Sequence, residues 1–250
     1  MEAYYPWIAL FLFLILAGLI LVFTLALRGR WPVFRPLSGF DAVIADLGRT
    51  VEAGTRIHVA LGEGEIIGTG AEAELAGLAA LARISQAASV SDRPPVATSG
   101  DGITSLLAQD VMFNVYRQMR AEERFDNDQG RLAGLGPLGY AAGAITTASQ
   151  ERVSVTFMIG AMGAEAALIA DAGSQGGNVV AAVTDPVGQA AVYATTDHPL
   201  LGEELFAAGA YLKVHPAHAA SLQAQDVIRW IAIGAILAGA LISTILRLMS

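Results

Sequence analysis

The chain has 250 residues, of which 15 are Lys or Arg and 23 are Asp or Glu, and it contains no cysteine. Disulfides and thiolate chemistry are therefore excluded. Between residues 36 and 225, 21 acidic residues face 10 basic ones, a balance of −11. This negative charge argues against binding nucleic acid and against electrostatic docking on anionic lipid.

The first element is an apolar run over residues 7–27 that contains no charged residue. At about 1.5 Å per residue, a helix of this length spans roughly 30 Å, the thickness of the hydrocarbon core of a bilayer. Only Glu2 is charged before the run, whereas a secretory signal begins with positive residues. We therefore expect a retained transmembrane helix, with a buried core helix as the alternative.

Positive residues follow this run at Arg28, Arg30 and Arg35, and no basic side chain precedes it. Because positive flanks stay on the cytoplasmic side, we expect the amino terminus outside the cell (inner) membrane and the following domain in the cytoplasm. A second apolar run lies near the carboxyl terminus. Arg229 on its expected inner side agrees with this orientation, whereas Arg247 on its expected outer side disagrees.

An amphipathic helix is predicted from residue 38, because apolar residues recur there with a 3.6-residue period and Gly54 provides a stop. Ser38 followed by Asp41 is typical of a capped helix start. Asp41 and Asp46 leave the helix without a basic face, so packing against protein is favoured over lying on the membrane surface.

From residue 56 onward, strand and helix patterns alternate. The expected strands cover residues 56–61, 95–99, 152–159 and 179–184, and 189–195 is a candidate for a further strand. The expected helices cover residues 71–89, 103–123, 164–172 and 203–212. Such alternation predicts an α/β fold, a Rossmann-like domain with a mainly parallel sheet and helices on both faces. The strand order stays open.

The domain organisation follows from these elements. We expect a first transmembrane helix in residues 1–29 and a juxtamembrane linker with the amphipathic helix in 30–55. The α/β domain then covers 56–215, and a helical extension with the second transmembrane helix covers 216–250.

Residues 132–150 carry no charge, which raises the alternative of a third membrane segment or a re-entrant one. Their content is mainly Gly, Ala, Ser and Thr around Pro137, with few large apolar side chains. This composition favours a buried, closely packed helix.

Three expected strands end in glycine-rich loops, at residues 62–70, 99–102 and 160–163. Ligands bind at the carboxyl ends of strands in open α/β sheets, and amides at a helix start can hold an anion. The third loop matches neither Gly-x-Gly-x-x-Gly nor the P-loop with its lysine, so we favour a tight turn that packs helix on strand. The weaker alternative is ligand binding by Ser99, Gly100, Asp101, Gly160, Gly163 and Glu165.

Asp101, Glu165 and Asp185 each follow an expected strand, so they could converge as a divalent-cation site. Helix capping produces the same positions, and we favour it. His215 and His218 lie three residues apart, which places both on one helix face, but a third ligand is not evident. We therefore predict no metal and no cofactor.

The second apolar run covers residues 227–246, and residues 216–225 are expected to continue into it as one helix. A buried core helix is again the alternative. Small residues spaced four apart let helix backbones approach closely, either between copies or against the first span near Ala17 and Gly18. These small residues are Gly234, Ala235, Ala238 and Gly239.

Residues 153–173, which contain Gly160-Ala-Met-Gly163, lie between the two apolar runs. Over roughly residues 49–212 the chain resembles an uncharacterised bacterial family of two-span membrane proteins with a domain of unknown function. The resemblance implies no catalytic residues, so none is assigned from it.

No serine nucleophile elbow, His-Glu-x-x-His motif, kinase signature or nucleotide-hydrolase signature is present, so we do not expect an enzyme. Neither apolar run has a charge in its middle, and two spans leave little protein for a transporter within one chain. We expect a membrane-anchored scaffold whose partners are the lipid bilayer and itself, as a homo-oligomer, with a ring favoured. One alternative is a membrane-tethered ligand- or nucleotide-binding sensor. The other is a divalent-ion-dependent hydrolase or transferase that uses Asp101.

Overall fold

The computed structural model describes residues 5–26, 31–68 and 70–249. Its contacts divide the chain into two compact units. One combines the residues up to Val33 with those from His215 onward, and the other is Phe34–Val214. Arg28 and Arg30, on which the predicted orientation partly rests, lie outside the described residues.

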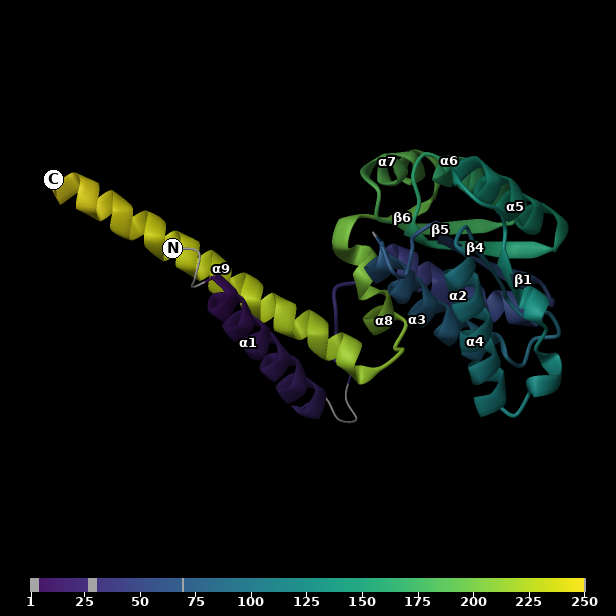
Figure 1. Cartoon of the computed structure of the whole chain (residues 1–250), viewed down its shortest axis with the longest axis horizontal. Helices are drawn as coiled ribbons and strands as arrows, with labels where there is room; N and C mark the ends of the chain where they lie inside the picture. The colour runs from purple at the N-terminus through teal and green to yellow at the C-terminus, as the bar shows by residue number, and fades with distance from the viewer. Residues whose placement is uncertain (1–4, 27–30, 69, 250) are drawn as a thin grey trace. The chain divides into compact units, whose positions relative to one another are not determined.

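The first unit is a pair of helices that pack against each other, α1 (Tyr5–Ala26) and α9 (Pro216–Met249) (Figure 1). Within the described residues, both are long and apolar enough to cross a membrane. Their large apolar side chains are mostly exposed. α9 runs from Pro216 without a break, which confirms the predicted helical extension into the second run.

The second unit is built on a sheet whose strands all run parallel, in the order β3-β2-β1-β4-β5-β6. In that order, the six strands found in the described residues are Gly130–Leu132, Val96–Ser99, Arg56–Gly62, Val153–Ala161, Asn178–Val183 and His198–Leu200. The order reverses direction between β1 and β4, which is the arrangement of dinucleotide-binding Rossmann domains. The predicted α/β fold with a parallel sheet is therefore confirmed.

Helices cover both faces of this sheet (Figure 1). One face carries α2 (Ser38–Ala53), α3 (Ala71–Ala88), α4 (Gly102–Gln118) and α8 (Ala208–Tyr211). The other carries α5 (Pro137–Gln150), α6 (Glu165–Gly176) and α7 (Pro186–Thr195). Short 3-10 helices lie at Glu122–Arg124, Asn127–Gln129 and Gly202–Ala207.

The uncharged stretch 132–150 mostly forms α5, and one face of this helix is buried in the α/β unit. Tyr140, Ala141 and Ala144 of α5 belong to one apolar cluster with Met158 of β4 and Ile169 of α6. Small side chains allow this close packing of helix on sheet. The stretch is therefore a core element of the α/β unit.

Two edge strands and one helix differ from the sequence prediction. Neither β3 nor β6 was predicted from the sequence. Residues 189–195, the candidate strand, belong instead to α7, so that interpretation is wrong. The carboxylate of Asp185 accepts hydrogen bonds from the amides of Val187 and Gly188, and Pro186 occupies the first turn. Both features start a helix there.

α2 ends as predicted, because Gly54 adopts a left-handed conformation with a φ of 61°. Phe40 is buried, which agrees with packing against protein. The predicted cap by Ser38 is wrong. The helix begins at Ser38 itself, and the preceding Leu37 makes no capping hydrogen bond with its side chain.

Candidate functional site

The carboxyl ends of β1 and β4 mark the point where the strand order reverses, and ligands of such sheets bind there. In this protein the two ends are joined: Gly62 pairs with Ala161, and the amide of Glu63 donates to the Ala161 carbonyl at 2.9 Å. A Cβ atom at Gly62 would lie 2.5 Å from the Ala161 carbonyl oxygen, and one at Gly160 would lie 1.7 Å from that of Leu61. These two glycines permit the close approach of the strands.

Glu74, in the first turn of α3, packs against these strand ends. Its side chain is buried, and Oε1 accepts hydrogen bonds from the amides of Gly64 at 3.1 Å and Ala161 at 3.4 Å. Oε2 is buried and has no partner in the described structure. Burial raises the pKa of Glu74 to about 8, against the opposing effect of the two amides. The carboxyl group of Glu74 thus accepts hydrogen bonds from two backbone amides that could otherwise bind a ligand phosphate.

Ser99, Gly100 and Asp101, predicted as ligand-binding residues, lie together at the carboxyl end of β2 and bond within the loop. The Gly100 amide donates to the Gly62 carbonyl at 2.7 Å, and the Asp101 amide donates to Ser99 Oγ at 3.0 Å. The Asp101 carboxylate accepts from the Thr104 amide at 2.8 Å. It therefore caps α4, as the favoured interpretation of the sequence has it.

The loop after β4 is shorter than the sequence indicates, because the strand includes Gly160 and continues to Ala161. The amide of Gly163 donates to Glu165 Oε1 at 2.6 Å, so these two candidate residues bond each other. Asp185 caps α7. Within the described residues, no three His, Asp or Glu side chains are placed to hold a metal ion.

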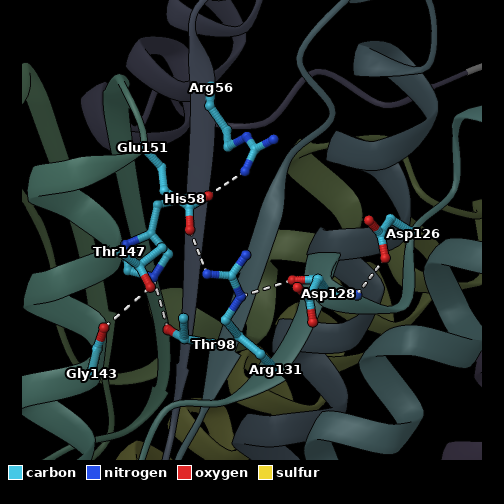
Figure 2. Close-up of polar contacts among 9 residues, drawn as sticks. All are labelled: Arg56, His58, Thr98, Asp126, Asp128, Arg131, Gly143, Thr147 and Glu151. Carbon is cyan, nitrogen blue, oxygen red and sulfur yellow. Dashed lines mark hydrogen bonds and ion pairs between the residues drawn. The ribbon is translucent and has the colours of Figure 1, made fainter.

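The opposite, amino end of the sheet carries an ion-pair cluster that the sequence reasoning missed. Glu151, between α5 and β4, forms ion pairs with Arg56 at the start of β1 and with Arg131 on β3 (Figure 2). Arg131 Nε also donates to the carbonyl of Asp128 at 2.8 Å. Because Glu151 binds both guanidinium groups, it links the first residues of β1 and β4 to the edge strand.

His58 lies deeper along β1 and is fully buried beside this cluster (Figure 2). Its Nε2 atom hydrogen-bonds with Thr98 Oγ1 on β2 at 2.8 Å, and Nδ1 has no partner in the described structure. Burial lowers the pKa of His58 to about 4, although the Glu151 carboxylate raises it. The imidazole is therefore neutral at physiological pH.

An open pocket of about 910 Å³ adjoins the ion-pair cluster, and most of its lining is charged. Arg124 in this lining donates to the carbonyls of Ser89 and Ser91. The guanidinium of Arg93 makes no hydrogen bond or ion pair within the described part of the chain. The arginines come from separate segments and only the strand order brings them together. The charged lining residues are Arg56, Arg93, Arg124, Arg131, Glu123, Asp126, Asp128 and Glu151.

Charge is distributed unequally between the two ends of the sheet. The loops and helix starts at the carboxyl end carry the acidic residues Glu63, Glu65, Glu72, Glu74, Asp101, Glu165 and Asp185. The segments that lead into the strands at the amino end carry the arginines Arg49, Arg56, Arg93, Arg117, Arg120, Arg124, Arg131 and Arg152. They also carry the acidic residues Asp46, Glu52, Asp92, Glu122, Glu123, Asp126, Asp128, Glu151 and Asp197, so charges of both signs are mixed at this end. The negative potential is therefore concentrated at the carboxyl end.

Large apolar side chains are also exposed at the carboxyl end. Ile67 in the loop after β1 is 85% exposed, and Leu135 and Leu138 after β3 are 74% and 75% exposed. We call these three residues, with the exposed Glu65 and Glu72, the carboxyl-end surface. Large apolar side chains left in water at one end of a domain mark an interaction site.

The small residues of α9 are exposed in the described structure. A Cβ atom added at Gly234 or Gly239 would meet nothing within 4 Å, and the same is true of Gly18 in α1. Ala235 and Ala238 are exposed as well. α1 therefore does not cover these glycines, although the two helices pack together.

The family model for a domain of unknown function (DUF6754) matches residues 3–250. The chain belongs to this family. The match covers both apolar helices and the whole α/β unit, so the resemblance noted in the sequence to a family with a domain of unknown function is confirmed. No curated protein and no solved structure matches the chain significantly.

Proposed function

We propose that this DUF6754 protein is a membrane-anchored scaffold that assembles as a homo-oligomer. The observation that carries the proposal is the carboxyl-end surface, where Ile67, Leu135 and Leu138 are exposed on a single chain. Burying such side chains contributes about 25 cal/mol per Å² of apolar area. In other sheets of this type, ligands bind between the carboxyl ends of the two central strands. Here the ends of β1 and β4 pair with each other through Gly62 and Ala161, so we assign the surrounding surface to a protein partner.

The anchor in this proposal is the helix pair α1 and α9. Their length and apolar composition support a position in the bilayer, and the exposed glycines of α9 offer a second surface for association. With both termini held in one membrane plane, the copies form a flat assembly, and closed symmetry makes a ring.

The test is the particle mass of the full-length protein, extracted gently and measured by mass photometry in several mild detergents. The proposal predicts particles at multiples of the 26.0 kDa chain mass, after correction for bound detergent. A monomer in every detergent would overturn it.

The proposed topology places the amino terminus outside and the α/β unit in the cytoplasm. The positive residues after α1 support it, although Arg35 is paired with Glu204 at 2.7 Å. A reporter at the carboxyl terminus should be accessible from outside the cell, and one inserted near Asn127, an exposed position, should not be. The reverse pattern would overturn the topology.

A second candidate function is a membrane-tethered ligand sensor, and the specific observation in its favour is the pocket of about 910 Å³ with the unpaired Arg93. An anionic ligand would bind that guanidinium group. Inorganic phosphate and nucleotides should then raise the melting temperature of the full-length protein. The rise should disappear in Arg93→Ala and persist in Glu165→Ala, which changes only the opposite end. No rise with any of these anions would remove this candidate.

A further inference from the structure

We infer that the open pocket at the amino end of the sheet binds a small dipolar molecule, one that carries both a carboxylate and an ammonium group, as a free α-amino acid does. This inference goes beyond the proposed scaffold and does not depend on it. It also differs from the sensor candidate, whose ligand is a simple anion bound by Arg93.

Arg93 supplies the positive contact in this pocket. It is half-buried, and its guanidinium group has no hydrogen bond or ion pair within the described part of the chain. Its backbone is held, because its amide donates to Ser91 Oγ at 3.2 Å and Pro94 follows it. A guanidinium group can bind a carboxylate through two parallel N–H bonds. Arg93 is therefore free to receive the carboxylate of a ligand.

Glu123 and Asp128 supply the negative contacts. Both line the same pocket and are exposed, and neither carboxylate has a hydrogen bond or ion pair among the described residues. The backbone of Asp128 is held on both sides, since its carbonyl accepts from Arg131 Nε at 2.8 Å and its amide donates to Asp126 Oδ1 at 3.1 Å (Figure 2). An ammonium group has three N–H donors for such carboxylates.

The charges of the lining select a dipolar ligand over a simple ion. Four arginines and four acidic residues line the pocket, so their formal charges cancel. Glu151 binds Arg56 and Arg131, and Arg124 donates to two backbone carbonyls. The charged groups that have no partner in the described structure therefore have both signs. A simple anion or cation would meet groups of its own sign there, whereas a dipolar ligand complements both.

The experiment measures binding to the full-length protein in detergent by isothermal titration calorimetry, with the standard free amino acids as probes. The pocket of about 910 Å³ has room for any of them. Each amino acid that binds is compared with its amide, which lacks the carboxylate, and with the same carboxylic acid without its amino group. We expect at least one amino acid to bind, and both of its analogues to bind more weakly by at least about tenfold, because each loses hydrogen bonds between charged groups.

Variants assign the two contacts. Arg93→Ala should weaken binding of the amino acid by at least about tenfold. Glu123→Gln with Asp128→Asn should lower its affinity to that of the carboxylic acid without the amino group. The matched controls are Arg117→Ala and Glu122→Gln, at exposed positions outside the pocket lining, and both should bind as the wild type does. Circular dichroism verifies that each variant is folded.

Each other outcome overturns the inference. If no free amino acid binds, the pocket does not take a dipolar ligand. If inorganic phosphate or the carboxylic acid binds as tightly as the amino acid, the pocket takes a simple anion, and the sensor candidate stands without this inference. Binding that persists in Arg93→Ala and in the doubly substituted acidic variant would place the ligand elsewhere. The scaffold is tested separately, by the particle mass.

Discussion

At the scale of single residues, two buried titratable groups give opposite pH dependence. Burial of Glu74 raises its pKa from 4.5 to about 8. The folded state therefore holds its proton more tightly than the unfolded state, and this contribution is complete below about pH 4.5 and is lost as the pH rises through about 8. Glu74→Gln removes the titration. Between pH 5 and pH 9 the wild type should therefore lose about 4 kcal/mol of unfolding free energy that the variant keeps, at about 1.4 kcal/mol per pKa unit.

Urea unfolding of the full-length protein and of Glu74→Gln at both pH values measures this difference. Parallel pH profiles for the two proteins would show that the carboxyl group is not held protonated.

His58 should act in the opposite direction. Its pKa falls from 6.5 to about 4 because the imidazole is buried. Its contribution to stability is therefore complete above about pH 6.5 and is lost as the pH falls through about 4. His58→Gln keeps a hydrogen-bonding group near Thr98 but does not titrate. Between pH 7 and pH 4 the wild type should lose about 3 kcal/mol more than this variant, measured by urea unfolding. An equal loss in both proteins would contradict the buried neutral imidazole.

Only part of this residue-level picture was available from the sequence. Asp101 could be assigned as a cap because it precedes a helical pattern, and the structure confirms this cap. Asp185 is also a cap, but the helix that it starts, α7, was interpreted from the sequence as a candidate strand. Glu74 was missed because an acidic residue in a first turn ordinarily stabilises the helix from the surface. Its burial depends on contacts with Gly64 and Ala161, ten and 87 residues away.

At the scale of elements, the β1–β4 pair depends on Gly160. A Cβ atom there would lie 1.7 Å from the Leu61 carbonyl oxygen, and the φ of Gly160 is 154°. Gly160→Ala should therefore separate the strands and destabilise the unit by more than about 3 kcal/mol. Gly163→Ala is the matched control, since its Cβ would meet only the Glu165 side chain, at 3.0 Å. Thermal unfolding of both variants measures the effect, and equal melting temperatures would contradict this role of Gly160.

The long elements could be predicted from sequence and the short ones could not. β1, α3, β4 and β5 have enough residues for an apolar period or an unbroken apolar run to appear. β3 and β6 have three residues each, too few for any period, and they are recognised only by pairing with β2 and β5. The missed ion-pair cluster has the same cause, because Arg131 belongs to β3.

At the scale of the whole molecule, the chain combines a pair of apolar helices with an α/β unit that carries more negative charge at the carboxyl end of its sheet. The helix pair could be predicted from length and the absence of charge alone. The polarity of the α/β unit could not, because it depends on which residues lie at each end of a sheet whose strand order the sequence leaves open.

Chemical cross-linking in native membranes tests the proposed homo-oligomer most directly, because the chain has no cysteine of its own to react. Cysteine is introduced at Leu138, in the carboxyl-end surface, and at Arg152, at the amino end, both of which are exposed. A bismaleimide should link chains that carry both cysteines into a ladder of dimers, trimers and larger species. The protein without introduced cysteines is the control and should give no cross-linked species, since it contains no cysteine. A doubly substituted protein that remains entirely monomeric after cross-linking would contradict the account.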